Sequence, residues 1–76
     1  MKIEVLGSGC AKCKLLAERA EEAAKNLGLT FTLVKVTAYP DIVARGVMTT
    51  PGLVVDGLVK SQGHVPTVKA IQDFLR

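Results

Sequence analysis

Hydrophobic and polar positions follow two different periods along this chain, and the changes of period divide it into predicted strands and helices. Residues 2–6 form a predicted strand that ends at a glycine-containing loop. Over residues 10–27, apolar side chains recur at the spacing of one helix face, and Gly28 can end this helix. That face consists of Leu16, Ala20, Ala23 and Leu27.

Two further elements are predicted in the middle of the chain. Residues 31–37 are mostly β-branched or apolar, which is typical of a strand. Pro40 can begin a short helix over residues 40–45, because its fixed φ suits the first turn, and Gly46 can end it.

A hairpin and a closing helix complete the pattern. Asp56-Gly57 separates the apolar runs 53–55 and 58–60, and this dipeptide predicts a type I′ turn, in which both central residues have positive φ. Residues 66–76 carry apolar side chains at helical spacing.

The predicted order is therefore β-α-β-α-β-β-α. The first two strands should run parallel, because a strand–helix–strand crossover is nearly always right-handed and parallel. The hairpin adds an antiparallel pair, so the fold class is α/β with a four-stranded mixed sheet. A chain of 76 residues with 49% hydrophobic residues is expected to form a single domain over residues 1–76.

Charge and composition exclude several classes of protein. The net charge is +3, and the basic residues are spread along the chain with only three aromatic residues among them, so we expect no nucleic-acid binding. No apolar run approaches the ~20 residues that span a bilayer, so we expect no membrane partner. Glu4 interrupts the start of the chain where a signal peptide is apolar, which predicts a cytoplasmic protein.

Cys10 and Cys13 are the two cysteines of the chain and carry its candidate chemistry. A disulfide between them would close so short a ring that chain entropy contributes only ~2 kcal/mol, which makes a purely structural role a poor explanation. Residues at i and i+3 of a helix share a face with Cα atoms ~5 Å apart, so the bond can form and break with little movement. Helix-terminal amides, Lys12 and Lys14 favour the thiolate of Cys10. We therefore predict Cys10 as the nucleophile and Cys13 as the resolving thiol.

Other interpretations of the cysteine pair remain open. A zinc site needs four ligands, and His64 is the single further candidate, so no metal is expected within one chain. His64 itself is expected to be a loop residue. A metal shared between two chains and a pair of ordinary buried cysteines are the remaining alternatives.

The motif GSGCAKCK after the first strand, TTP before the third strand and the closing helix together resemble the thioredoxin-like superfamily. The chain is most similar to its small thioredoxin/glutaredoxin-like members, the small redox-active disulfide proteins. This resemblance implies a minimal thioredoxin-like fold in which the Thr50-Pro51 bond is cis and lies beside the cysteines. It also implies that the Thr50 backbone binds an extended substrate segment. The glutathione-binding Gly-Gly of glutaredoxins is not matched by residues 61–64.

A charged pair is also implied by the resemblance. Ordinary thioredoxins carry a buried acid six residues before the first cysteine and a lysine on the adjacent strand, and Glu4 and Lys35 are similarly placed here. The two would then form a proton relay that accepts the proton of Cys13. The alternative, which the length of the glutamate side chain favours, is a solvent-facing ion pair across the two strands.

We interpret the sequence as that of a monomeric thiol–disulfide oxidoreductase that needs no cofactor. Its expected partners are disulfide-containing proteins, which it reduces, and an upstream disulfide reductase. One alternative is a soft-metal carrier of the Cu(I) type, although Ser8 stands where such carriers place a methionine and residues 66–76 are helical rather than extended. The other alternative is a non-catalytic module that uses the dithiol as a redox switch.

Overall fold

The computed structural model describes residues 1–9 and 11–76, and its elements follow the predicted order. The elements are β1 (Lys2–Leu6), α1 (Ala11–Asn26), β2 (Thr32–Val36), α2 (Tyr39–Ala44), β3 (Gly52–Val55), β4 (Leu58–Gln62) and α3 (Val68–Leu75). Among the residues that the structure describes, no helix has the length and apolar character needed to cross a membrane.

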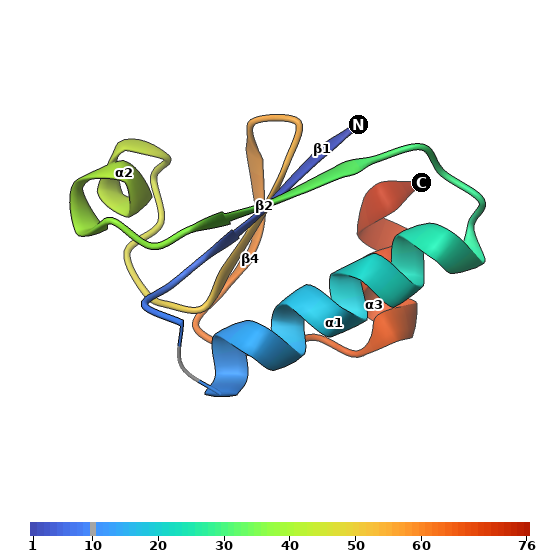
Figure 1. Cartoon of the computed structure of the whole chain (residues 1–76), viewed down its shortest axis with the longest axis horizontal. Helices are drawn as coiled ribbons and strands as arrows, with labels where there is room; N and C mark the ends of the chain where they lie inside the picture. Colours follow the sequence, from blue (N-terminus) through green and yellow to red (C-terminus); the bar gives the residue numbers. More distant parts are fainter. Residues whose placement is uncertain (10) are drawn as a thin grey trace.

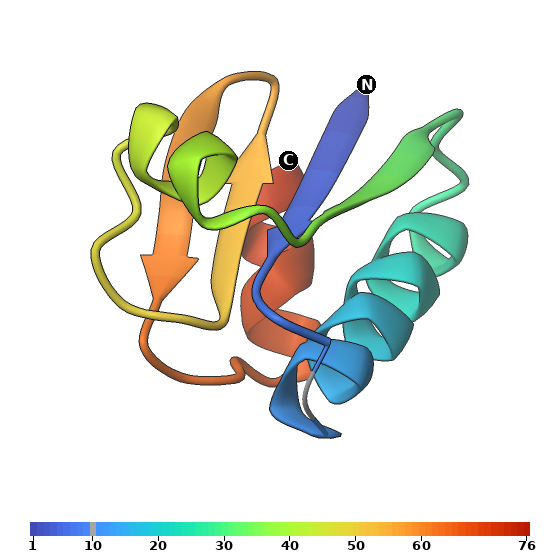
Figure 2. The ribbon, with the colours of Figure 1, turned by 60° about the vertical axis from the view of Figure 1, so that its left-hand side comes forward.

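The four strands form one mixed sheet in the order β2-β1-β3-β4. β1 runs parallel to β2 and antiparallel to β3, and β3 runs antiparallel to β4, as predicted. Helices α1 and α3 pack on one face of this sheet, and α2 lies on the other (Figure 1). Figure 2 shows α2 in front of the sheet and α3 behind it.

Side chains of β1 alternate between two hydrophobic cores, because successive residues of a strand point to opposite faces. Ile3 and Val5 belong to the core between the sheet and helices α1 and α3. Leu6 belongs to the smaller core beneath α2. Glu4 shares the α2 face with Leu6 and is also buried. Side chains on the two faces of β1 therefore lie in two different environments, one on the side of α1 and α3 and the other on the side of α2.

Element boundaries differ from the predicted ones by a few residues. The start of the first helix was predicted at Cys10, which lies outside the described residues. Gly28 adopts a left-handed φ of 69° after the end of α1, and its N–H donates to Lys25 O, so it acts as the predicted cap. β4 continues to Gln62 instead of ending at residue 60, because its backbone pairs with Gly52 whether or not the side chains are apolar.

The β3–β4 turn has the predicted geometry. Asp56 and Gly57 both have positive φ, 49° and 84°. Asp56 Oδ1 also accepts a hydrogen bond of 2.7 Å from the N–H of Lys2, which fixes the turn against the start of β1. This turn lies at the end of the sheet opposite the β1–α1 junction (Figure 2).

Candidate functional site

Cys13 lies in the first turn of α1, directly after the loop that leaves β1. Its side chain is buried, with 5% of its surface exposed. Cys10, the predicted nucleophile, lies outside the described residues, so its role remains a prediction. The described part of the site consists of Cys13 and the segments that surround it.

Gly7 forms the wall against which Cys13 packs. The N–H of Gly7 donates to Val36 O at 2.9 Å, which holds the backbone beside β2 after β1 has ended. A Cβ atom at position 7 would overlap Cys13 Sγ and would lie 3.8 Å from Thr50 Cβ. Gly7, Cys13 and Thr50 therefore meet at one point. No role is predicted for Gly7 from the sequence; its place in the motif GSGC is the signal that points to it.

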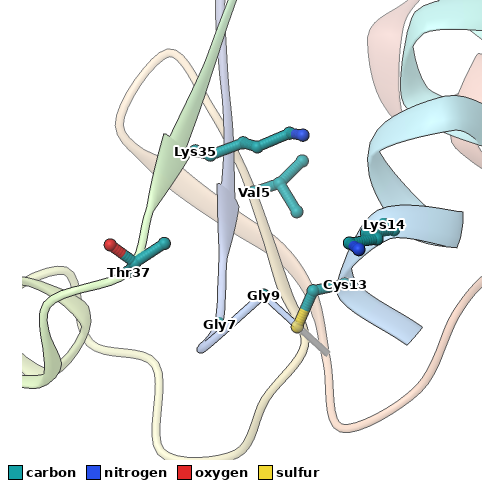
Figure 3. A pocket seen from close by; sticks show the side chains of 7 residues that line it. All are labelled: Val5, Gly7, Gly9, Cys13, Lys14, Lys35 and Thr37. Carbon is teal, nitrogen blue, oxygen red and sulfur yellow. The ribbon is translucent and has the colours of Figure 1, made fainter. Parts of the chain in front are cut away.

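A small pocket of about 60 Å³ opens beside Cys13 (Figure 3). Among the residues that the structure describes, no acidic side chain lines this pocket. The lining residues are Val5, Gly7, Gly9, Cys13, Lys14, Lys35 and Thr37. In Figure 3 the Lys35 side chain extends from β2 in the direction of α1, where Lys14 lies. The charged side chains of this lining, those of Lys14 and Lys35, are both cationic.

The structure does not bring Glu4 and Lys35 together. In the parallel register, Glu4 is level with Val34, and Lys35 is level with Val5. Neighbouring positions of a strand point to opposite faces, so Lys35 lies on the α1 side of the sheet and Glu4 on the α2 side. The predicted solvent-facing pair is wrong, because the partner assignment assumed a register that the sequence alone does not determine.

Glu4 instead forms an ion pair with Arg45, the residue that caps the C-terminus of α2. Arg45 Nε donates to Glu4 Oε2 at 2.6 Å, and 7% of the Glu4 side chain is exposed. Arg45 also donates from Nη1 to Asp41 O at 3.0 Å. The ion pair thus joins the central strand to the last turn of α2. The sequence does not predict this role of Arg45, because no local pattern connects it with β1.

The loop after α2 carries the predicted substrate-binding residues. The Thr50–Pro51 peptide bond is cis, as the resemblance implies; Pro51 is buried, whereas Thr50 is exposed. Gln62 Oε1 accepts hydrogen bonds from the N–H groups of Met48 at 2.8 Å and Thr49 at 3.4 Å. The Gln62 side chain of β4 therefore holds the backbone segment that leads into Pro51. This contact was not predicted.

His64 lies in the loop between β4 and α3. Its Nδ1 atom is 3.3 Å from Gln62 O, and its Nε2 atom is 3.5 Å from Ser61 Oγ. Within residues 1–9 and 11–76, no group of three or more histidine, cysteine, aspartate or glutamate side chains is placed to hold a metal ion.

The mixed sheet, the cysteine at the β1–α1 junction and the cis-proline loop beside it define a thioredoxin-like redox protein. The family model described as "Thioredoxin domain" matches residues 1–76, and the chain belongs to this family. In general terms it is a thiol–disulfide oxidoreductase.

Two similar proteins are both named thioredoxin. The one from Methanothermobacter thermautotrophicus (strain Delta H) is 39% identical over 75 residues, which cover 99% of this chain and 97% of that protein. The one from Methanocaldococcus jannaschii is 35% identical over 74 residues, which cover 97% of this chain and 85% of that protein.

A solved structure is similar in fold. Thioredoxin 1 from the thermophilic eubacterium Thermosipho africanus TCF52B superposes with a TM-score of 0.59 at 20% sequence identity. The match covers 99% of this chain and 94% of that chain, and it shows that the thioredoxin-like fold predicted from the sequence is correct.

Proposed function

We propose that this protein reduces disulfide bonds in protein substrates by cycling Cys10 and Cys13 between dithiol and disulfide. The observation that carries the proposal is the meeting of Cys13, Gly7 and Thr50 at one point, beside a pocket lined by lysines. A buried thiol next to an exposed, substrate-facing loop suits the second step of such a reaction, in which the attacking group is already inside the protein.

The reaction balances in two steps. The thiolate of Cys10 attacks one sulfur of the substrate disulfide; the new S–S bond forms as the substrate bond breaks, and the leaving sulfur takes up a proton. Cys13 then loses its proton, and its thiolate attacks the sulfur of Cys10. The first substrate sulfur leaves and is protonated in turn. Two electrons pass from the dithiol to the substrate, and an upstream disulfide reductase returns them.

We assign Lys35 to the second step, in which its positive charge acts on the Cys13 thiolate. It lines the same pocket as Cys13, and we infer that its positive charge favours the thiolate that attacks Cys10. The pocket has room for a water molecule, since its volume of about 60 Å³ exceeds the ~15 Å³ that one water needs, and we assign such a water as the proton acceptor. Glu4 does not accept the proton of Cys13 in this proposal, because its side chain lies on the other face of β1 and is paired with Arg45.

Thr50 and Pro51 are assigned to substrate binding. Thr50 is exposed and lies beside Gly7 and Cys13, so an extended segment that pairs with its backbone would carry a disulfide to the cysteines. In this proposal the protein works in the cytoplasm, as a monomer and without a cofactor.

Insulin reduction with dithiothreitol as the terminal reductant tests the proposal. We expect catalysed precipitation of the insulin B chain by the wild-type protein, no catalysis by Cys10→Ser, and full activity of the wild type in the presence of a metal chelator. A Cu(I) competition assay on the reduced protein serves as the second arm. Tight stoichiometric Cu(I) binding without insulin reduction would support a metal carrier and overturn the proposal.

A further inference from the structure

We propose that this site selects protein disulfides whose flanking residues are acidic. The inference rests on the proposed function and narrows its substrate class. The observation behind it is a separation of charge: two exposed lysines line the pocket beside Cys13, and every carboxylate of the described residues lies outside the lining of that pocket.

Lys14 and Lys35 supply the positive side of this separation. They come from α1 and β2, and both are exposed where they line the pocket beside Cys13. Lys12, also exposed, lies in the same first turn of α1 as Cys13. Over residues 1–9 and 11–76, the side-chain ion pairs are Lys25–Glu21 and Arg45–Glu4, so none of these three lysines is neutralised by a carboxylate. Their charge is available to a substrate.

The nearest acidic residue along β1 is withdrawn from the site. Glu4 points to the α2 face and is paired with Arg45. Its negative charge is therefore balanced on the side of the sheet opposite Lys35, and it does not offset the lysines around Cys13.

Acidic residues of α1 lie in later turns of the helix. Glu18, Glu21 and Glu22 line a separate pocket together with Lys25 and Asn26. Lys25 donates to Glu21 Oε1 at 2.7 Å and holds the pKa of Glu21 below its usual value. The other carboxylates are those of Asp41 on α2, Asp56 in the β3–β4 turn and Asp73 on α3.

This arrangement favours acidic substrates for an electrostatic reason. The attacking thiolate of Cys10 is itself negative, so an acidic segment would be repelled by it unless positive charge stood nearby. Lysines that have no carboxylate partner and lie near Cys13 offset that repulsion. They raise the rate of encounter with negatively charged segments and lower the rate of encounter with positively charged ones. Because these lysines are exposed, the preference must weaken as salt screens their charge.

Three small disulfides of similar size separate this inference from the proposed function. They are dithiodipropionate, which is negative, bis(hydroxyethyl) disulfide, which is neutral, and cystamine, which is positive. At low salt we expect the second-order rate to be about five-fold higher for the negative than for the neutral disulfide, and lowest for cystamine. The ratio should approach one in high salt. If the neutral disulfide is not reduced at all, the proposed function fails; if all three react alike, this inference alone fails.

Variants identify the lysines responsible. The double variant Lys14→Gln/Lys35→Gln should bring the negative-to-neutral rate ratio close to one. The matched control Lys60→Gln/Lys69→Gln removes two exposed lysines, of β4 and α3, that do not line the pocket, and it should keep the wild-type ratio. An equal loss of preference in the control would assign the effect to net charge and overturn the inference.

A pair of cyclic disulfide peptides tests the commitment to protein substrates. The two peptides share one sequence except that aspartates in one replace lysines in the other beside the half-cystines. We expect the aspartate peptide to be reduced faster by a similar factor. A preference for dithiodipropionate without a preference between the peptides would point to small acidic disulfides and would overturn the inference for proteins.

Discussion

Gly7 lies directly against the Sγ atom of Cys13, so closely that a side chain at position 7 would occupy the place of the sulfur. Its φ is not in the left-handed region, so an alanine could adopt the backbone conformation. The requirement for glycine is therefore one of space next to the thiol. The thiol position and the end of β1 are coupled through this contact.

Gly7→Ala should push the Cys13 thiol away from its position and slow the second step of the reaction. We expect resolution of a mixed disulfide at Cys10 to slow by an order of magnitude, with a loss of stability of about 1–3 kcal/mol from overpacking. Stopped-flow release of the second thiol from an aromatic disulfide measures the step. Ser8→Ala, at the exposed neighbouring position, is the control. A wild-type resolution rate in Gly7→Ala would show that the contact has no bearing on the chemistry.

Glu4 and Arg45 should be coupled energetically, whereas Glu4 and Lys35 should not. Arg45→Gln leaves a buried carboxylate without its cation, and since Arg45 is one-third exposed we expect a loss of about 1–3 kcal/mol. Double-mutant cycles by urea unfolding with Glu4→Gln should give a coupling of about 1 kcal/mol or more for Arg45 and less than about 0.5 kcal/mol for Lys35→Gln. The opposite order would mean that the two faces of β1 have been assigned wrongly.

Lys35→Gln should act on the reaction rather than on folding. Lys35 lines the same pocket as Cys13, so removal of its positive charge should leave the Cys13 thiolate less stabilised, and we expect resolution of the mixed disulfide to slow several-fold near neutral pH. Glu4→Gln should leave the pH profile of this step unchanged, since its carboxylate lies on the other face of β1. A changed profile in Glu4→Gln would restore the proton relay that we set aside.

Gln62 should act on substrate binding, because its side-chain oxygen holds the backbone of Met48 and Thr49 next to the exposed Thr50. Gln62→Ala removes this acceptor, and we expect KM for a peptide disulfide to rise several-fold with little change in kcat. Gln62→Glu keeps an acceptor oxygen and should recover most of the loss.

Gln72→Ala is the control for this prediction, since it removes a side-chain hydrogen bond between α3 and α1 that is remote from the loop. Equal KM values for Gln62→Ala and the wild type would show that the loop keeps its position without this contact.

The sequence predicted the elements well because local signals determine them. Asp56-Gly57 fixed the turn type, and Gly28 marked the end of α1, since both positions need a left-handed φ. The order and the directions of the strands followed from the crossover rule and the hairpin.

The partners of individual side chains were harder to predict because they depend on contacts between distant segments. Glu4 was expected opposite Lys35, but the register places it level with Val34, and Arg45 reaches it from a different element. The contact between Gly7 and Cys13 depends on where α1 starts relative to β1, which no periodicity reveals.

The most direct test of the proposed mechanism is the covalent species that Cys13→Ser forms with a peptide disulfide, measured by intact mass and then by peptide mapping. We predict one peptide attached through Cys10 in a stable mixed disulfide. The wild-type protein should instead release both peptide sulfurs and end with its own cysteines joined. Cys10→Ser should form no adduct, because Cys13 is buried. A stable adduct on Cys13, or a wild-type adduct as long-lived as that of Cys13→Ser, would contradict the roles assigned to the two cysteines.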